Sequence, residues 1–97
     1  MFFVYILKCS DGSYYTGHTD NLESRIAAHD DGSFGGYTVD RLPVNVVHVQ
    51  EFQTRDEAFA AERQIKGWSR RKKEALIQQD WNKLQRYAMR FKKFETN

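Results

Sequence analysis

The stretch from Phe3 to Arg25 constrains the fold of this 97-residue chain more than any other segment. It contains two short runs rich in β-branched and aromatic residues, a turn sequence between them, and the start of a helical pattern. The run from Phe2 to Leu7 is apolar on both alternating faces, which predicts a central strand buried on both sides. The run from Ser13 to His18 predicts the returning strand of a β-hairpin.

The connection Ser10-Asp11-Gly12 decides how two tyrosines are arranged on this hairpin. A two-residue turn places Tyr5 and Tyr15 on opposite faces, whereas a three-residue connection with a bulge at Gly12 places them on the same face. If both tyrosines serve one site, the bulged connection is the one to expect.

The next segment has the pattern of a helix that ends near Asp30. Asp20 followed by Glu23 predicts a capping box at its start. Arg25 and His29 share an i, i+3, i+4, i+7 stripe with Leu22 and Ile26, so both are expected to face the sheet. An inward-facing arginine needs an anionic partner, either a carboxylate such as Glu62 or a phosphate.

A loop from Asp31 to Pro43 carries Tyr37, Thr38 and Arg41, and a loop of this length in a small domain is often functional. Val44 to Phe52 predicts a third strand. Thr54 and Glu57 then form a capping box for a helix to about Lys66. The buried arc of that helix comprises Ala58, Ala61, Ile65 and Trp68, with Glu62 on its rim.

Two more helices are predicted after Gly67, which ends the preceding one. Ser69 caps a helix to about Gln78, and Asp80 caps a last helix whose apolar stripe is Trp81, Leu84, Ala88 and Phe91. The expected fold is α/β (α+β), a three-stranded, mainly antiparallel sheet packed with helices. The N-terminal hairpin and the helices bearing Arg25 and Glu62 are expected to converge on one side of this sheet. It forms a single domain over residues 1–97, with a core at about 2–77 and a C-terminal helix and tail at 79–97.

Charge is distributed unevenly along the chain. Residues 1–62 carry four Lys or Arg against ten Asp or Glu, a net charge of −6, whereas residues 63–97 carry eleven against three, a net charge of +8. A polyanionic partner touching the C-terminal third explains this asymmetry, and a solvated helical face explains it equally well. A single cysteine and the lack of a membrane-length apolar run favour a cytoplasmic protein that does not bind membranes. The three histidines lie in separate segments, so no zinc cluster is expected.

Several of these residues together resemble the GIY-YIG nuclease superfamily, over about residues 2–77. Phe3-Val4-Tyr5 and Tyr15-Thr16-Gly17 are similar to its paired motifs, and Arg25, His29, a third strand and Glu62 follow in the family's order. The run from Ser69 to Ile77 resembles the short stand-alone bacterial members, whose relatives include an excision-repair nuclease module. His18 stands where some members have a lysine.

The resemblance implies metal-dependent phosphodiester hydrolysis at one site. Glu62 would hold Mg²⁺ or Mn²⁺, Arg25 would bind the scissile phosphate, and Tyr5 or Tyr15 would help take a proton from the attacking water. His29 would hydrogen-bond a tyrosine or the phosphate. The nucleic acid, DNA in preference to RNA, would contact Gly17, His18, Tyr37, Arg41, Lys66, Arg70, Arg71 and Lys72.

The leading hypothesis is therefore a small DNA endonuclease of repair or recombination, structure-directed or non-specific, because phosphate contacts would dominate its binding. One alternative is a non-catalytic nucleic-acid-binding module on the same fold. Another is an interaction adaptor that docks a protein partner through the helix bearing Trp81, Leu84 and Phe91.

Overall fold

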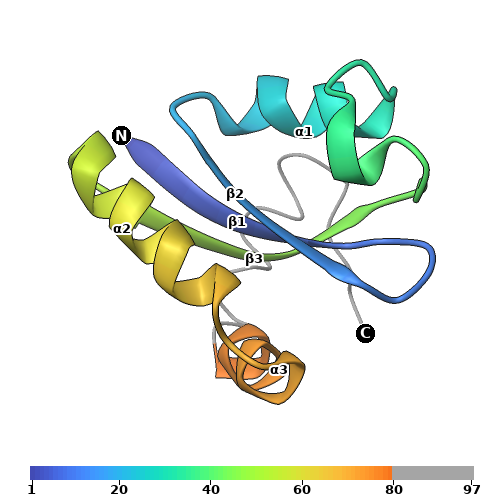
Figure 1. Cartoon of the computed structure of the whole chain (residues 1–97). Coiled ribbons are helices and arrows are strands. Elements are labelled where there is room, and N and C mark those ends of the chain that lie inside the picture. The colour runs from blue at the N-terminus through green and yellow to red at the C-terminus, as the bar shows by residue number, and fades with distance from the viewer. Residues whose placement is uncertain (80–97) are drawn as a thin grey trace.

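Three antiparallel strands form one sheet in a computed structural model that describes residues 1–79 of the chain. They are β1 (Phe2–Lys8), β2 (Tyr14–Thr19) and β3 (Asn45–Phe52), arranged in the order β2-β1-β3 (Figure 1). The strand β1 takes the central position because it is apolar on both faces, and Val4 to Leu7 are completely buried. The predicted antiparallel sheet and the central place of the first strand are confirmed.

The β1–β2 hairpin has the predicted bulged connection. Its register sets Tyr5 opposite Gly17 and Leu7 opposite Tyr15. The amide of Cys9 donates to the carbonyl of Ser13 at 2.8 Å, which leaves three residues in the connection. The last of these is a glycine, Gly12, with φ +84°, a value that disfavours any residue with a side chain. Tyr5 and Tyr15 therefore point to the same face of the sheet.

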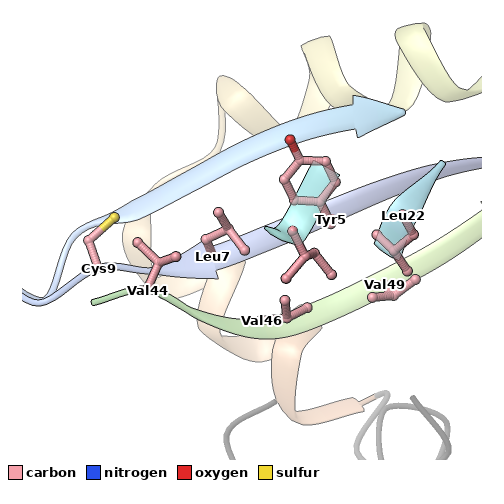
Figure 2. Packing of buried hydrophobic residues seen from close by; sticks show 8 residues of the cluster. Tyr5, Leu7, Cys9, Leu22, Val44, Val46 and Val49 are labelled. Atoms are coloured by element: carbon pink, nitrogen blue, oxygen red, sulfur yellow. The ribbon is translucent and has the colours of Figure 1, made fainter. Parts of the chain in front are cut away.

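Each face of the sheet is covered by different helices (Figure 1). The helix α1 (Leu22–Asp30) packs on the face that carries Tyr5, in a core completed by Leu7, Cys9, Leu22, Ile26, Val44, Val46 and Val49. Figure 2 shows this core, with the Tyr5 hydroxyl directed toward β2. The helices α2 (Arg55–Lys66) and α3 (Arg70–Gln79) pack on the other face, against Val4, Ile6 and Val47.

The start of α1 differs from the prediction. Its N-cap is Asn21, whose Oδ1 accepts the Ser24 amide at 3.1 Å, so the predicted capping box of Asp20 and Glu23 is wrong. The amide of Asn21 is in turn bound to Thr19 Oγ1 at 3.1 Å, and this bond orients the side chain that forms the cap. The Asp20 carboxylate instead pairs with Arg55 on α2, at 3.4 Å.

The other helix boundaries follow the sequence closely. The Thr54–Glu57 capping box at the start of α2 is present, and Gly67 forms its C-cap. Ser69 Oγ accepts the Lys72 amide at 3.2 Å at the start of α3. The loop between α1 and β3 contains one short 3₁₀ helix, η1 (Gly36–Thr38). The predicted last helix, with Trp81, Leu84, Ala88 and Phe91, lies outside the described residues. In the part of the chain that is described, no helix is both long and apolar enough to span a membrane.

Candidate active site at the edge of the sheet

A buried chain of hydrogen bonds joins β1, α1 and the loop after α1. The hydroxyl of Tyr5 lies 2.9 Å from His29 Nε2, and His29 Nδ1 lies 2.8 Å from Thr38 Oγ1. The stripe pattern of α1 had placed His29 toward the sheet, and the structure places it there with no exposed surface. Thr38, which shares its loop with Tyr37 and Arg41, is buried and bound to His29, so it is not available to a ligand at the surface.

Burial sets the protonation of these groups. It lowers the pKa of His29 to about 4, with the nearby Arg25 charge acting in the same direction, so the imidazole is neutral at pH 7. Burial also raises the pKa of Tyr5 well above its usual range, as do Tyr15 and Glu62, while Arg25 opposes the shift. The pKa of Tyr15 is raised too, mainly by burial. Both phenols therefore remain protonated at neutral pH in this state of the site.

Tyr15 and Gly17 lie beside Tyr5 on the same face of β2. The rings of Tyr5 and Tyr15 are 6.4 Å apart between centroids, and Tyr15 stacks on Tyr37 at 6.1 Å. A Cβ atom at Gly17 would lie 2.5 Å from the Tyr5 hydroxyl oxygen and 2.7 Å from its ring carbon Cζ. Gly17 was expected to permit approach of the substrate; what the structure displays is the room it leaves for the Tyr5 phenol.

Arg25 stands at the outer end of this group, partly buried on α1. Its Nη1 donates to the carbonyl oxygen of His18 at 3.3 Å, and its guanidinium lies 4.8 Å from the centre of the Phe34 ring. These two contacts use only part of its donor fork, so the guanidinium retains hydrogen-bonding capacity for an anion.

Glu62 approaches the same strand from the opposite side. The residue is only 7 % exposed, and its carboxylate has Oε1 2.8 Å from His18 Nδ1 and Oε2 3.3 Å from Lys66 Nζ. Because an ionised carboxylate only accepts hydrogen bonds, His18 Nδ1 carries the hydrogen. Among residues 1–79, the ion pairs of Glu62 are these two, so the alternative of a salt bridge to Arg25 is not observed.

The two halves of the site meet at His18 on β2, which is an edge strand among the described residues. His18 holds Arg25 through its backbone carbonyl and Glu62 through its ring. The sequence predicted convergence on one side of the sheet. Instead, Tyr5, Tyr15 and Arg25 lie on the α1 face and Glu62 comes from α2 on the other face, and they approach one another around the edge of the sheet. The Glu62 charge nevertheless acts on the pKa of both tyrosines.

The basic residues among the predicted nucleic-acid contacts fall into two groups. Two of the arginines make internal contacts: Arg41 binds Asp11 at 3.1 Å and the Tyr37 carbonyl at 2.8 Å, and Arg70 binds the Gly12 carbonyl at 2.6 Å and Glu74 at 3.2 Å. These contacts fix the hairpin tip to its surroundings. The remaining basic residues, Lys66, Arg71 and Lys72, are exposed on α2 and α3.

The donor set suits a hard divalent cation better than zinc. Within residues 1–79 no three His, Cys, Asp or Glu side chains gather in a metal-binding group. Glu62 is the one carboxylate in the site, and a single carboxylate suffices for Mg²⁺, which retains several waters and also binds substrate phosphates. The residues fit such an ion, provided that the Lys66 ammonium moves away from Glu62 Oε2.

Fold and site together define a nuclease-type domain of the GIY-YIG class. The chain belongs to this family, since the model of the GIY-YIG catalytic domain matches residues 1–75. Members of this class bind nucleic acid, in general DNA, and generally use divalent metal ions.

More specifically, the chain is similar to UPF0213 proteins, which are short stand-alone GIY-YIG proteins. It is 45 % identical to that of Natronomonas pharaonis, over 77 % of this chain and 88 % of the relative, and 45 % identical to that of Staphylococcus saprophyticus, over 77 % and 92 %. The solution NMR structure of the UPF0213 protein from Bacillus halodurans is 43 % identical, covering 80 % of this chain and 84 % of its own, with a TM-score of 0.53.

Sequence reasoning missed two exposed rings beside the site, Phe34 and Phe59. Phe34 lies in the glycine-rich loop, where no periodic pattern reveals which way a side chain points. Phe59 lies on α2 three positions before Glu62, next to the predicted buried arc. An aromatic residue at an exposed helix position one turn from a candidate ligand was the signal available.

Proposed function

We propose that this protein is a divalent-metal-dependent DNA endonuclease that hydrolyses a phosphodiester bond at the β2 edge. The observation that carries the proposal is that His18 binds two groups at once. Its backbone carbonyl holds the guanidinium proposed to bind phosphate, and its ring holds the carboxylate proposed to bind the metal. Two hydrogen-bonding phenols lie next to them, on the adjoining face.

Arg25 is the group proposed to bind the scissile phosphate. A guanidinium presents a planar fork of donors that matches two phosphate oxygens, and it remains charged at any physiological pH. Its partly buried position strengthens its interaction with negative charge that builds up on the phosphate during attack.

Glu62 is the proposed ligand of Mg²⁺ or Mn²⁺. When bound there, the ion supplies Lewis-acid chemistry to a phosphate oxygen. The His18 N–H would keep the carboxylate oriented by holding Oε1, and the exposed Lys66 ammonium would neutralise Oε2 until a cation replaces it.

Tyr5 and His29 are proposed to act as a pair on the attacking water. A phenol with a raised pKa is a poor base, and a buried imidazole whose pKa is lowered to about 4 is a poor acceptor for its proton, so Tyr5 is proposed to orient the water by a hydrogen bond and not to take its proton. The neutral imidazole of His29, 2.9 Å away, holds the phenol in place. Tyr15, whose ring packs against both members of this pair, is proposed to orient the water or the phosphate by a hydrogen bond.

DNA binding would depend mainly on phosphate contacts from Arg25, Lys66, Arg71 and Lys72, which makes it salt-sensitive and weakly dependent on sequence. A role in DNA repair or recombination, on branched or nicked substrates, is in keeping with such binding.

The test compares cleavage of branched, nicked and plain DNA by the wild type, Glu62→Gln and a matched control, Glu23→Gln, with Mg²⁺ present. Glu23 is exposed in the first turn of α1. We expect Glu62→Gln alone to lose cleavage while it retains DNA binding and its melting temperature. If wild type and Glu62→Gln bind DNA equally and neither cuts any substrate, the protein is a binding module and not an endonuclease.

A further inference from the structure

The exposed aromatic rings of residues 1–79 are gathered around the candidate site. They are Phe34 at 38 %, Tyr37 at 42 % and Phe59 at 45 % exposed, whereas the other aromatic rings in this range are buried or half-buried. Large apolar side chains are normal on a surface when they are scattered singly. Rings concentrated at one place indicate that something binds there.

These rings lie on two sides of the groups that bind phosphate and metal. Phe34 contacts His29, at 4.2 Å between ring centroids, and lies under the Arg25 guanidinium. Phe59 contacts the His18 ring at 5.6 Å, one helical turn from Glu62. A strand of nucleic acid crossing from Arg25 to Glu62 therefore passes from one exposed ring to the other.

An arginine guanidinium also lies over each exposed ring. Arg25 lies 4.8 Å from the Phe34 ring centre, Arg41 3.9 Å from that of Tyr37, and Arg63 5.6 Å from that of Phe59. A ring next to a cation matches the two parts of a nucleotide, since the base stacks on an aromatic or guanidinium plane and the phosphate is neutralised.

We propose that this surface binds an unpaired segment of DNA, with bases on opposite sides of the scissile phosphate stacking on the guanidinium-covered rings of Phe34 and Tyr37 and of Phe59. The proposal rests on the proposed function, because it takes the scissile phosphate to lie between Arg25 and Glu62. In a duplex the base faces are already stacked inside the helix, so protruding rings cannot reach them; an unpaired strand exposes them.

An apolar peptide is a poorer match for the same surface. Covering the rings with apolar side chains would also remove the guanidinium groups over them from water, which is costly for a charged group. A phosphodiester strand supplies both the flat apolar faces and the negative charge.

Binding without cleavage is the decisive measurement. Fluorescence anisotropy in EDTA compares a labelled oligothymidylate with a duplex of the same length, for the wild type, Tyr37→Leu and Phe59→Leu. We expect each ring substitution to weaken binding of the single strand about tenfold and binding of the duplex less than twofold. Phe59→Trp should retain wild-type binding. Val39→Ala, which shortens an exposed apolar side chain in the loop that carries Tyr37, should have no effect.

A second readout detects the stacking itself. A 2-aminopurine placed in the oligonucleotide should lose fluorescence on binding to the wild type and to Phe59→Trp, and less so with Phe59→Leu. Equal affinity of the wild type for duplex and single strand, unchanged by the ring substitutions, would overturn this inference. Cleavage that depends on Glu62 would still support the proposed function in that case. Conversely, ring-dependent binding of the single strand by a protein that cuts no DNA would refute the proposed endonuclease activity and support the proposed binding surface. Tighter binding of the matching RNA strand would overturn the assignment to DNA.

Discussion

The Tyr5 hydroxyl and the imidazole of His29 are 2.9 Å apart, and this contact joins residues 24 positions apart in the interior of the protein. The other nitrogen of the ring is also occupied, by Thr38 Oγ1. Because the imidazole is neutral, one nitrogen donates and the other accepts. Either Tyr5 donates to the ring and the ring to Thr38, or the direction of both bonds is reversed. The position of one proton thus links the phenol to a residue of the loop.

The buried His29 makes stability depend on pH. Its pKa is lowered to about 4 in the fold, against a usual value near 6.5, so the unfolded chain binds a proton that the folded chain excludes. The contribution of His29 to the free energy of unfolding is therefore fully present above pH 6.5 and is lost as the pH drops toward 4. We expect the free energy of unfolding, from urea titrations, to be about 2 kcal/mol lower at pH 5 than at pH 7.

His29→Gln isolates this effect, since glutamine can hydrogen-bond but does not titrate. The variant should be less stable at pH 7, and its free energy of unfolding should no longer decrease between pH 7 and pH 5. Asp11 and Asp31, whose pKa values are lowered by hydrogen bonds to Ser13 and Ser33, act only in more acidic solution. A slope that persists in His29→Gln would show that another group is responsible.

Gly17→Ala should destabilise the fold. The added Cβ would lie 2.5 Å from the Tyr5 hydroxyl oxygen, in a buried region where the ring cannot move away freely. Overpacking of this kind costs about 1–3 kcal/mol in unfolding free energy, which thermal and urea unfolding can measure.

Gly67→Ala is the matched control, because its added Cβ would come no closer than 3.5 Å to Gln64 O and its φ is −80°. It should leave stability unchanged or raise it by up to about 1 kcal/mol. Similar losses in both variants would mean that the contact with Tyr5 is not the cause.

Arg25→Lys should reduce cleavage by about a hundredfold or more while the charge is kept, because lysine lacks the donor fork that fits a phosphate. Single-turnover rates on a fixed DNA substrate measure the effect. Arg55→Lys, an exposed arginine paired with Asp20 on the surface, is the control and should cut at the wild-type rate. Full activity of Arg25→Lys would remove Arg25 from its proposed role.

Lys66→Met should raise the affinity for Mn²⁺ about two- to fivefold, because the ammonium 3.3 Å from Glu62 Oε2 competes with the metal, and an i, i+4 ion pair of this kind is weak. Calorimetric titration of the protein without DNA gives the affinity. Arg63→Met removes a charge from the same helix with no contact to Glu62 and should change it less. Equal gains in both variants would indicate a general effect of charge on metal binding.

Local patterns predicted most of the fold. The continuous apolar run of β1, the Thr54 capping box and Gly67 each act within a few residues, so the sequence reveals them directly. The cap of α1 was misplaced by one residue, because Asp20 and Asn21 are both good caps and the choice depends on Thr19 and on the distant Arg55.

The candidate site was predicted only in part because its contacts are non-local. The stripe on α1 predicted that His29 faces inward, but nothing in the sequence links it to Thr38 across the loop. The approach of Glu62 from the other face depends on β2 being at the edge of the sheet, and strand order is not written in any single segment.

The double use of His18 has an evolutionary consequence. Arg25 is held by the peptide carbonyl at this position, which every amino acid provides, whereas Glu62 is held by the side chain, which mutation can exchange. If Glu62 binds a cation and Arg25 a phosphate as proposed, natural variation at position 18 would change how the metal ligand is held while the phosphate-binding arginine stays anchored. A protein built in this way could diversify its metal preference one substitution at a time.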